Sequence, residues 1–207
     1  MSGRRVAVAA VLAIALAVAS IGCKKSGGGA AIIPAPPVAE FACSPLEGGT
    51  TTDFTFTDAS TGVITSWSWD FGANASPATA STQGPHSVTY STAGSKTISL
   101  TVTGPGGSDI ETKTNVITVY GVPVADFTAT PLEGGTTTNF AFTDASTGTI
   151  TSWSWDFGAG ASPATASTQG PHNVTYSTTG SKTVSLTVTG PGGTDTMTKT
   201  NYILRWP

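Results

Sequence analysis

The sequence predicts an all-β protein made of two tandem β-sandwiches that follow an N-terminal export segment and a flexible tether. Almost all of the sequence after residue 37 consists of two copies of one repeat, in which Trp69 corresponds to Trp155 and Tyr90 to Tyr176. Apolar residues alternate with Thr and Ser inside each copy, which is the period of a β-strand. Only 10% of residues are charged, whereas the chain has 25 Gly and 13 Pro, which favour turns.

Residues 1–22 indicate a signal peptide of the lipoprotein type. Arg4 and Arg5 precede an unbroken apolar run over residues 6–21, which is short for a spanning helix of about 20 residues. The run ends in Ser20-Ile21-Gly22-Cys23, which resembles the bacterial lipobox, whose Cys receives diacylglycerol and becomes the mature N-terminus. We therefore expect a lipid on Cys23 that anchors the chain in the cell envelope, at the outer membrane or cell surface.

Two other interpretations of this segment stay open. Ser20 stands where the lipobox usually has Leu, and an ordinary signal peptidase could cut after Ala19. The protein would then be secreted with a free thiol at Cys23. A retained N-terminal anchor helix is the third possibility.

Residues 23–37 indicate the tether. Its Gly27–Gly29 run is flexible, and its proline-rich end is stiffer. Lys24 follows Cys23, with no Asp there, which resembles lipoproteins sent on to an outer membrane.

The first copy, residues 38–120, predicts six or seven short strands and no helix. The expected strands are 39–43, 51–58, 64–71, 87–91, 97–103 and 109–119. Most of 72–85 is expected to be loop, and 104–107 is a hairpin turn by composition. The side chains expected to face inward are Phe54, Phe56, Val88, Tyr90, Ile98, Leu100 and Val102. Short alternating strands at this density are typical of an immunoglobulin-like β-sandwich.

The central strand of each copy carries three aromatic residues at alternate positions. Trp67, Trp69 and Phe71 are two residues apart, so an extended strand points all three to one face. We expect them to pack in the core, since only a second sheet could cover that much apolar surface. An aromatic platform for sugar rings is the alternative. Trp206, outside the repeat, is the aromatic residue expected to be exposed.

The second copy spans residues 124–207, and only Gly121-Val122-Pro123 joins it to the first. So short a joint with a proline in it predicts a fairly stiff connection.

The repeat resembles the PKD (polycystic kidney disease) domain, an immunoglobulin-like module. The residues that carry the resemblance are Trp69, Asp70, Phe71, Gly72, Tyr90, Gly94, the 97–102 strand and 114–117 in copy one, with Trp155, Asp156, Phe157, Gly158, Tyr176, Gly180, the 184–188 strand and 200–203 in copy two. The family usually continues Gly-Asp-Gly after the Phe, whereas Gly72-Ala73-Asn74 and Gly158-Ala159-Gly160 stand here. The missing Asp argues against a metal or ligand role for that loop.

The polar residues give no catalytic set. His86 and His172, the only histidines, lack partners at a useful spacing and are expected to be polar residues at the start of a strand. Asp58 and Asp70, with Asp144 and Asp156, could bind calcium, but turn and strand-edge hydrogen bonds explain them as well. No dense acidic loop of the calcium-binding kind is present in the sequence. We expect no enzyme activity, no cofactor and no metal.

Cys43 has no counterpart, because Ala129 stands at its place in copy two. It shares a strand face with Phe41, which predicts a buried, inert thiol. A disulfide with Cys23 is the alternative and would exclude the lipid.

Composition excludes one partner class. The formal net charge is -3 and becomes more negative once the segment with Arg4 and Arg5 is removed, so nucleic acid is an improbable partner.

The sequence therefore predicts a non-enzymatic envelope or surface lipoprotein. The resemblance implies that its two domains serve as an adhesion, protein-interaction or spacer module, with an extracellular protein or polysaccharide as ligand. The alternatives are a carbohydrate-binding accessory module related to secreted hydrolases and a structural subunit that polymerises along its edge strands.

Overall fold

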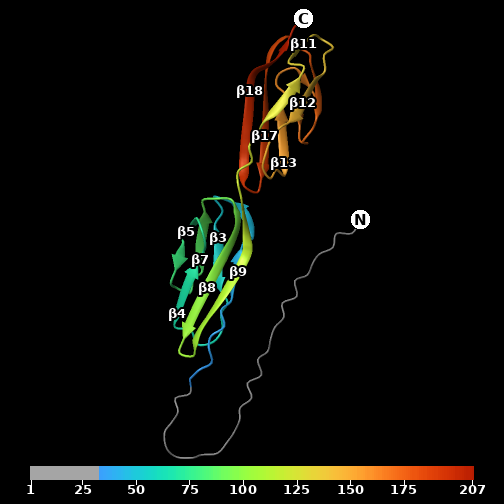
Figure 1. Ribbon diagram of the computed structural model, residues 1–207. Coiled ribbons are helices and arrows are strands. Elements are labelled where there is room, and N and C mark those ends of the chain that lie inside the picture. The colour runs from blue at the N-terminus through green and yellow to red at the C-terminus, as the bar shows by residue number, and fades with distance from the viewer. Residues whose placement is uncertain (1–32) are drawn as a thin grey trace, which may run out of the picture. The chain divides into compact units, whose positions relative to one another are not determined.

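The computed structural model describes residues 33–207, and all regular structure in that range is β-strand (Figure 1). The predicted signal peptide, Cys23 and most of the predicted tether lie outside the described residues. The range contains two β-sandwiches, which are described in turn.

Two sheets make up the first sandwich. Its strands are β1 (Phe41–Ser44), β2 (Glu47–Gly49), β3 (Phe54–Asp58), β4 (Ser66–Asp70), β5 (Ala75–Ser76), β6 (Thr79–Ala80), β7 (His86–Tyr90), β8 (Gly94–Gly104) and β9 (Gly107–Tyr120). One sheet has the order β1-β3-β7-β5 and the other β2-β9-β8-β4-β6. All pairs are antiparallel except β2 with β9, which run parallel.

The second sandwich repeats this topology. Its strands are β10 (Phe127–Thr130), β11 (Glu133–Gly134), β12 (Phe140–Asp144), β13 (Ser152–Asp156), β14 (Ala161–Ser162), β15 (Thr165–Ala166), β16 (His172–Tyr176), β17 (Gly180–Gly190) and β18 (Gly193–Arg205). Its sheets have the orders β10-β12-β16-β14 and β11-β18-β17-β13-β15. The two copies therefore share one immunoglobulin-like architecture.

Each sandwich has its own hydrophobic core between its two sheets. The core of the first consists of Ala39, Phe41, Phe54, Phe56, Trp69, Phe71, Val88, Tyr90, Ile98, Leu100, Val102, Ile117 and Val119. The second core uses the corresponding residues of copy two and shares none with the first. All seven side chains predicted to face inward are buried, which confirms the alternation of the strands.

The structure corrects two burial predictions on this sheet pair. Trp69 and Phe71 are buried, but Trp67 is only half-buried and packs at the margin of the core. Its indole Nε1 donates to Asp58 at 2.9 Å, so one edge of the ring has to reach the polar rim. Cys43 is also half-buried rather than buried, because β1 is an edge strand.

The strand bounds also differ from those predicted. The structure adds β2, β5 and β6, each of two or three residues, and the last two fall in the segment expected to be loop. The tryptophan strand β4 ends at Asp70, one residue before the predicted end.

The hairpin between β8 and β9 packs closely against two neighbouring backbones. A Cβ on Gly104 would overlap the carbonyl oxygen of Val63, and one on Gly106 would overlap the backbone of Pro34 and Ala35. The proline-rich segment 34–37, which precedes the first strand, therefore lies against this hairpin, and only glycine permits the contact.

Candidate binding face

The aromatic motif residues form the core rather than an exposed platform. The rings of Trp69 and Phe71 stack with centroids 5.6 Å apart, and Phe41 packs edge-on to Trp69 at 5.5 Å. Trp155 and Phe157 repeat the stacked pair at 5.6 Å. Aromatic pairs in these arrangements stabilise a core beyond their buried area.

The residues that follow the tryptophan make a fixed turn. Asp70 Oδ1 accepts a hydrogen bond from the backbone N–H of Gly72 at 2.8 Å. Gly72 has φ of 82°, and a Cβ there would also meet the carbonyl oxygen of Thr97 at 2.6 Å, so only glycine fits. The Tyr90 hydroxyl then donates to the carbonyl oxygen of Phe71 at 2.8 Å.

The outer face of the larger sheet carries rows of hydroxyl groups, which we call the hydroxyl face. On three neighbouring strands, the cross-strand register places side chains in rows of three. In the second sandwich the rows are Ser152–Thr189–Thr194, Ser154–Thr187–Thr196 and Asp156–Ser185–Thr198. All nine side chains are exposed or half-exposed. The face thus presents eight hydroxyls and one carboxylate.

The first sandwich carries a nearly identical face. Its rows are Ser66–Thr103–Ser108, Ser68–Thr101–Ile110 and Asp70–Ser99–Thr112. Ile110, which is 59% exposed, replaces one hydroxyl with an apolar side chain.

A shallow concavity of about 430 Å³ lies at one end of this face in the second sandwich. Its lining comes from Asp156 on β13, from Ser181, Lys182, Thr183 and Ser185 on β17, from Thr198 on β18, and from Gly158 and Ala159 after β13. Five oxygen-bearing side chains from three strands thus converge on one hollow.

A β-bulge lies beside the concavity. The pairing of β17 with β18 shifts register between Lys182 and Val184, and Asn201 on the facing strand adopts φ of 52°. A bulge bends a sheet locally, and the first sandwich has the same bulge between Lys96 and Ile98.

The sequence profile of the PKD domain matches the chain twice, over residues 34–119 and 121–204. The chain belongs to the PKD-domain family. PKD domains are typical of extracellular proteins and typically non-catalytic, and two of them in tandem are consistent with an interaction or spacer module.

Solved structures that resemble the chain are arrays of β-sandwich domains. The titin I-band fragment I67–I69 has a TM-score of 0.47 and 13% identity over 84% of this chain and 66% of its own. The ectodomain of mouse nectin-like molecule 4 has a TM-score of 0.38 and 9% identity, covering 81% of this chain and 64% of its own. The first four immunoglobulin domains of Dscam1 have a TM-score of 0.37 and 12% identity, covering 84% of this chain and 46% of their own. The chain thus spans less than two thirds of each, and no curated protein matches it.

Each PKD domain uses its histidine for packing. The His86 ring lies edge-on to Trp69 at 5.5 Å and to Phe71 at 5.7 Å, at the first position of β7. Its Nε2 lies 2.9 Å from the carbonyl oxygen of Thr82, an acceptor, so Nε2 carries the proton. His172 repeats these contacts.

Asp58, the last residue of β3, holds a turn of the PKD domain and reaches Trp67 on β4 of the other sheet. It accepts hydrogen bonds from the Ser60 N–H at 2.9 Å, Trp67 Nε1 at 2.9 Å and Gln83 Nε2 at 3.0 Å. Burial raises the pKa of this carboxyl group, but the three donors outweigh burial and hold the pKa below its ordinary value. Asp144 is placed in the same way.

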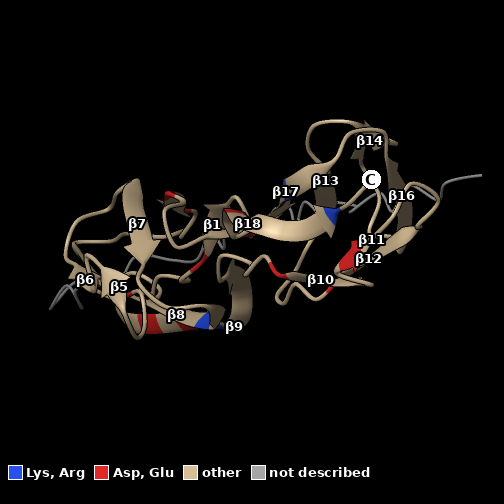
Figure 2. Cartoon of the chain, turned by 90° about the horizontal axis from the view of Figure 1, so that it is seen from above, with Lys and Arg blue, Asp and Glu red and all other residues tan. Residues whose placement is uncertain are grey.

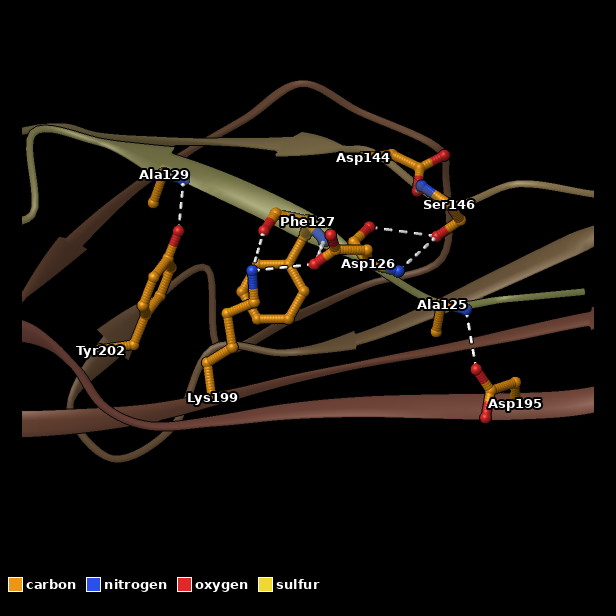
Figure 3. Close-up of polar contacts among 9 residues, drawn as sticks. All are labelled: Ala125, Asp126, Phe127, Ala129, Asp144, Ser146, Asp195, Lys199 and Tyr202. Carbon is orange, nitrogen blue, oxygen red and sulfur yellow. Dashed lines mark hydrogen bonds and ion pairs between the residues drawn. The ribbon is translucent and has the colours of Figure 1, made fainter.

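A lysine on the last strand of each PKD domain ties that strand to the first. Lys199 pairs with Asp126 at 2.8 Å, donates to the carbonyl oxygen of Phe127, and lies 4.8 Å from the centre of the Phe127 ring (Figure 3). The pKa of Asp126 is lowered by this lysine. Lys113 contacts Glu40 and Phe41 in the first domain. Figure 2 shows that charged residues are sparse along the ribbons of both domains.

Cys43 carries no sign of reactivity. Burial raises the pKa of its thiol, an effect that nearby Lys113 only partly opposes, so the reactive thiolate is disfavoured.

Residues 33–207 contain no group of three His, Cys, Asp or Glu side chains placed to hold a metal ion. The same part of the chain has no helix long and apolar enough to cross a membrane.

Sequence reasoning singled out Asp156 as a motif residue and weighed it as a calcium ligand, but it missed the concavity beside it. The Ser and Thr residues that line the concavity look like ordinary strand residues in the sequence. The signal that could have found them is the run of Ser and Thr at alternate positions on adjacent strands.

Proposed function

We propose that the chain is an exported, lipid-anchored protein whose two PKD domains form a non-enzymatic interaction module at the cell envelope. The observation that carries this proposal is the tandem PKD match over nearly all of the described residues. The extracellular ligand is a protein or a polysaccharide.

The histidine and Asp58 of the first domain, with their counterparts in the second, are committed to structural contacts. His86 packs on the aromatic core, and Asp58 holds three donors. Catalysis needs a nucleophile and a base within reach of one another at a site where substrate fits. These groups serve the fold instead, which supports a binding or spacer role over an enzyme.

The anchor rests on the N-terminal sequence. Ser20-Ile21-Gly22-Cys23 at the end of an apolar run supports a diacylglyceryl group on Cys23, through which the membrane becomes a partner. The predicted tether, residues 23–37, would then separate the first PKD domain from the bilayer.

A carbohydrate-binding accessory module is the second candidate function. The concavity on the hydroxyl face favours it, since polar groups converging in a hollow are what a ligand site needs. Passive spacing is the outcome if neither a protein nor a polysaccharide binds.

The anchor is tested by the mass of the mature protein in the native host. We expect an N-terminal Cys23 with added acyl chains, and partitioning into detergent. Cys23→Ser should leave the protein unlipidated and in the aqueous phase. A mature chain that begins after Ala19 with a free Cys23 would overturn the anchor and leave the interaction role standing.

The interaction role is tested with immobilised residues 33–207 against the host's envelope proteins and a panel of polysaccharides. A saturable ligand that a soluble competitor displaces supports the role. Substrate turnover by the purified domains would overturn the non-enzymatic part.

A further inference from the structure

We propose that the concavity at the end of the hydroxyl face binds one sugar unit of a neutral glycan. This inference rests on the proposed interaction module and names the ligand class and the surface. It departs from an aromatic sugar platform, because the motif tryptophans are used in the core.

The carboxylate of Asp156 has one oxygen available to a ligand. Its Oδ1 accepts the N–H of Gly158 at 2.8 Å, which fixes the side chain at the rim of the hollow. Oδ2 makes no hydrogen bond within residues 33–207. A fixed carboxylate oxygen is a strong acceptor for the hydroxyl groups of a sugar.

The hydroxyls of the concavity differ from those further along the same face. Thr187 bonds to Thr196 at 2.8 Å, and Thr189 to Thr194 at 3.0 Å, so those hydroxyls satisfy one another. In the described part of the chain, no such bond engages the hydroxyls that line the concavity, which are those of Ser181, Thr183, Ser185 and Thr198. Each can donate and accept, which suits a ligand rich in hydroxyls.

The charge of the site argues against a calcium ion and against a negatively charged sugar. One carboxylate is too few for a calcium ion, which takes six to eight oxygen ligands, several of them usually carboxylates. Lys182 also lines the concavity, but its Nζ is engaged elsewhere, since it donates to Thr178 Oγ1 at 2.7 Å and lies 5.4 Å from the Tyr176 ring centre. A negatively charged sugar would therefore meet Asp156 with no cation to offset it.

The size of the hollow suits a small group rather than a long chain. Its volume of about 430 Å³ lies near the lower end of the range for ligand pockets, and it is shallow. Without an aromatic wall we expect weak binding to one unit, of millimolar order. A polymer offers many units, so binding becomes measurable through rebinding and through a second site.

The first PKD domain carries the same residue types at the corresponding positions, and we take these as the second site. Asp70, Ser95, Thr97, Ser99 and Thr112 occupy the positions that line the concavity in the second domain. The same chemistry therefore occurs twice in one chain.

The test is affinity electrophoresis of the full chain in detergent micelles, with a neutral glucan, mannan, galactan or xylan in the gel. We expect at least one of these polymers to retard the protein. The double variant Thr112→Val and Thr198→Val should weaken the retardation about tenfold or more, because it removes one hydroxyl from each site and keeps the shape. Asp70→Asn with Asp156→Asn should weaken it as well.

The matched control is Thr103→Val with Thr189→Val, which removes hydroxyls of the same face that bond to neighbours outside the hollow. Its retardation should equal that of the natural chain. Unchanged circular dichroism shows that each variant is folded.

Four results would overturn the proposal: no retardation by any neutral polymer, equal retardation of the concavity variants, retardation by alginate alone, or retardation abolished by EDTA. A chain that binds an envelope protein but no neutral glycan would overturn this inference and leave the interaction module intact. A chain that binds no envelope protein but is retarded through Thr198 would support the site and identify its ligand as glycan.

Discussion

Single residues at the rim of each sandwich fasten turns to the sheets. Asp58 joins the turn at Ser60, the half-buried Trp67 and the loop residue Gln83. Its pKa is below the ordinary value of 3.8, so the folded state holds the carboxylate more tightly than the unfolded chain does. The stabilisation is present above the unfolded pKa and is lost as pH falls through the folded pKa.

We predict that Asp58→Asn with Asp144→Asn lowers the free energy of unfolding by about 1–2 kcal/mol per site at pH 7, since a charge-assisted acceptor is lost. Urea unfolding between pH 7 and pH 2.5 measures this. The natural chain should lose stability below about pH 4, and the variant should lose less over the same interval. Glu133→Gln, at an exposed position, is the control and should keep the natural pH profile. Equal acid sensitivity of variant and natural chain would contradict the assignment.

The buried hydroxyl groups of Tyr90 and Tyr176 are a second kind of single-residue contact that stabilises the sandwiches. Tyr176 donates to the carbonyl oxygen of Phe157 at 2.8 Å, and burial raises the pKa of its phenol to about 12. We predict that Tyr176→Phe costs about 1–2 kcal/mol, because the carbonyl loses its buried donor. Tyr120→Phe, on a tyrosine whose hydroxyl reaches the exposed Glu47, should cost less than about 0.5 kcal/mol. Chemical denaturation measures both variants. Equal losses of stability for Tyr176→Phe and Tyr120→Phe would contradict the prediction.

At the scale of elements, the hairpin between β8 and β9 requires small residues. We predict that Gly104→Ala lowers the free energy of unfolding by more than about 2 kcal/mol, because its methyl group would overlap the carbonyl oxygen of Val63. Gly121→Ala is the matched control, since a Cβ there meets nothing closer than Ala93 at 3.8 Å. Guanidinium unfolding measures both, and a harmless Gly104→Ala would show that the backbones are further apart.

Strand alternation predicted the long elements well. The alternation of Ile98, Leu100 and Val102 with Thr and Ser predicted β8, and all three are buried. The strand β2 was missed because Glu47–Gly49 shows no alternation and gains its pairing only from the distant β9. Its Gly48 packs against Thr52, a contact that no local pattern reveals.

The concavity could not be predicted for a similar reason. Asp156, Ser185 and Thr198 meet only through the register of three strands, and the hollow lies beside a bulge that shifts this register. A sequence shows alternation, but it does not show which residues of two strands stand opposite each other. Trp67 shows the same limit, because its exposed edge depends on Asp58 in another strand.

The sheet edges bear on the whole molecule. The edge strands β5 and β6 have two residues each, β2 has three and β1 has four. The long strand β9, however, is paired on its outer side by β2 only at Thr118, Val119 and Tyr120, so the rest of that edge offers a template for another chain. Polymerisation along this edge therefore stays an alternative function.

Separate cores predict that each sandwich folds by itself. Trp69→Ala should cost about 3–5 kcal/mol, enough to unfold much of the first sandwich, while the second keeps its stability. Trp155→Ala is the mirror variant and should do the reverse. Limited proteolysis with mapped fragments reads out which half survives. Loss of both halves in either variant would contradict two independent cores.

The central claim is that the folded part of this chain is an interaction module. Its most direct test is the binding isotherm of labelled residues 33–207 on host envelopes that lack the protein. We predict saturable binding that unlabelled protein displaces and that the double variant Trp69→Ala, Trp155→Ala loses. Linear uptake that no competitor displaces, equal for the folded chain and the double variant, would contradict the claim and leave a passive spacer.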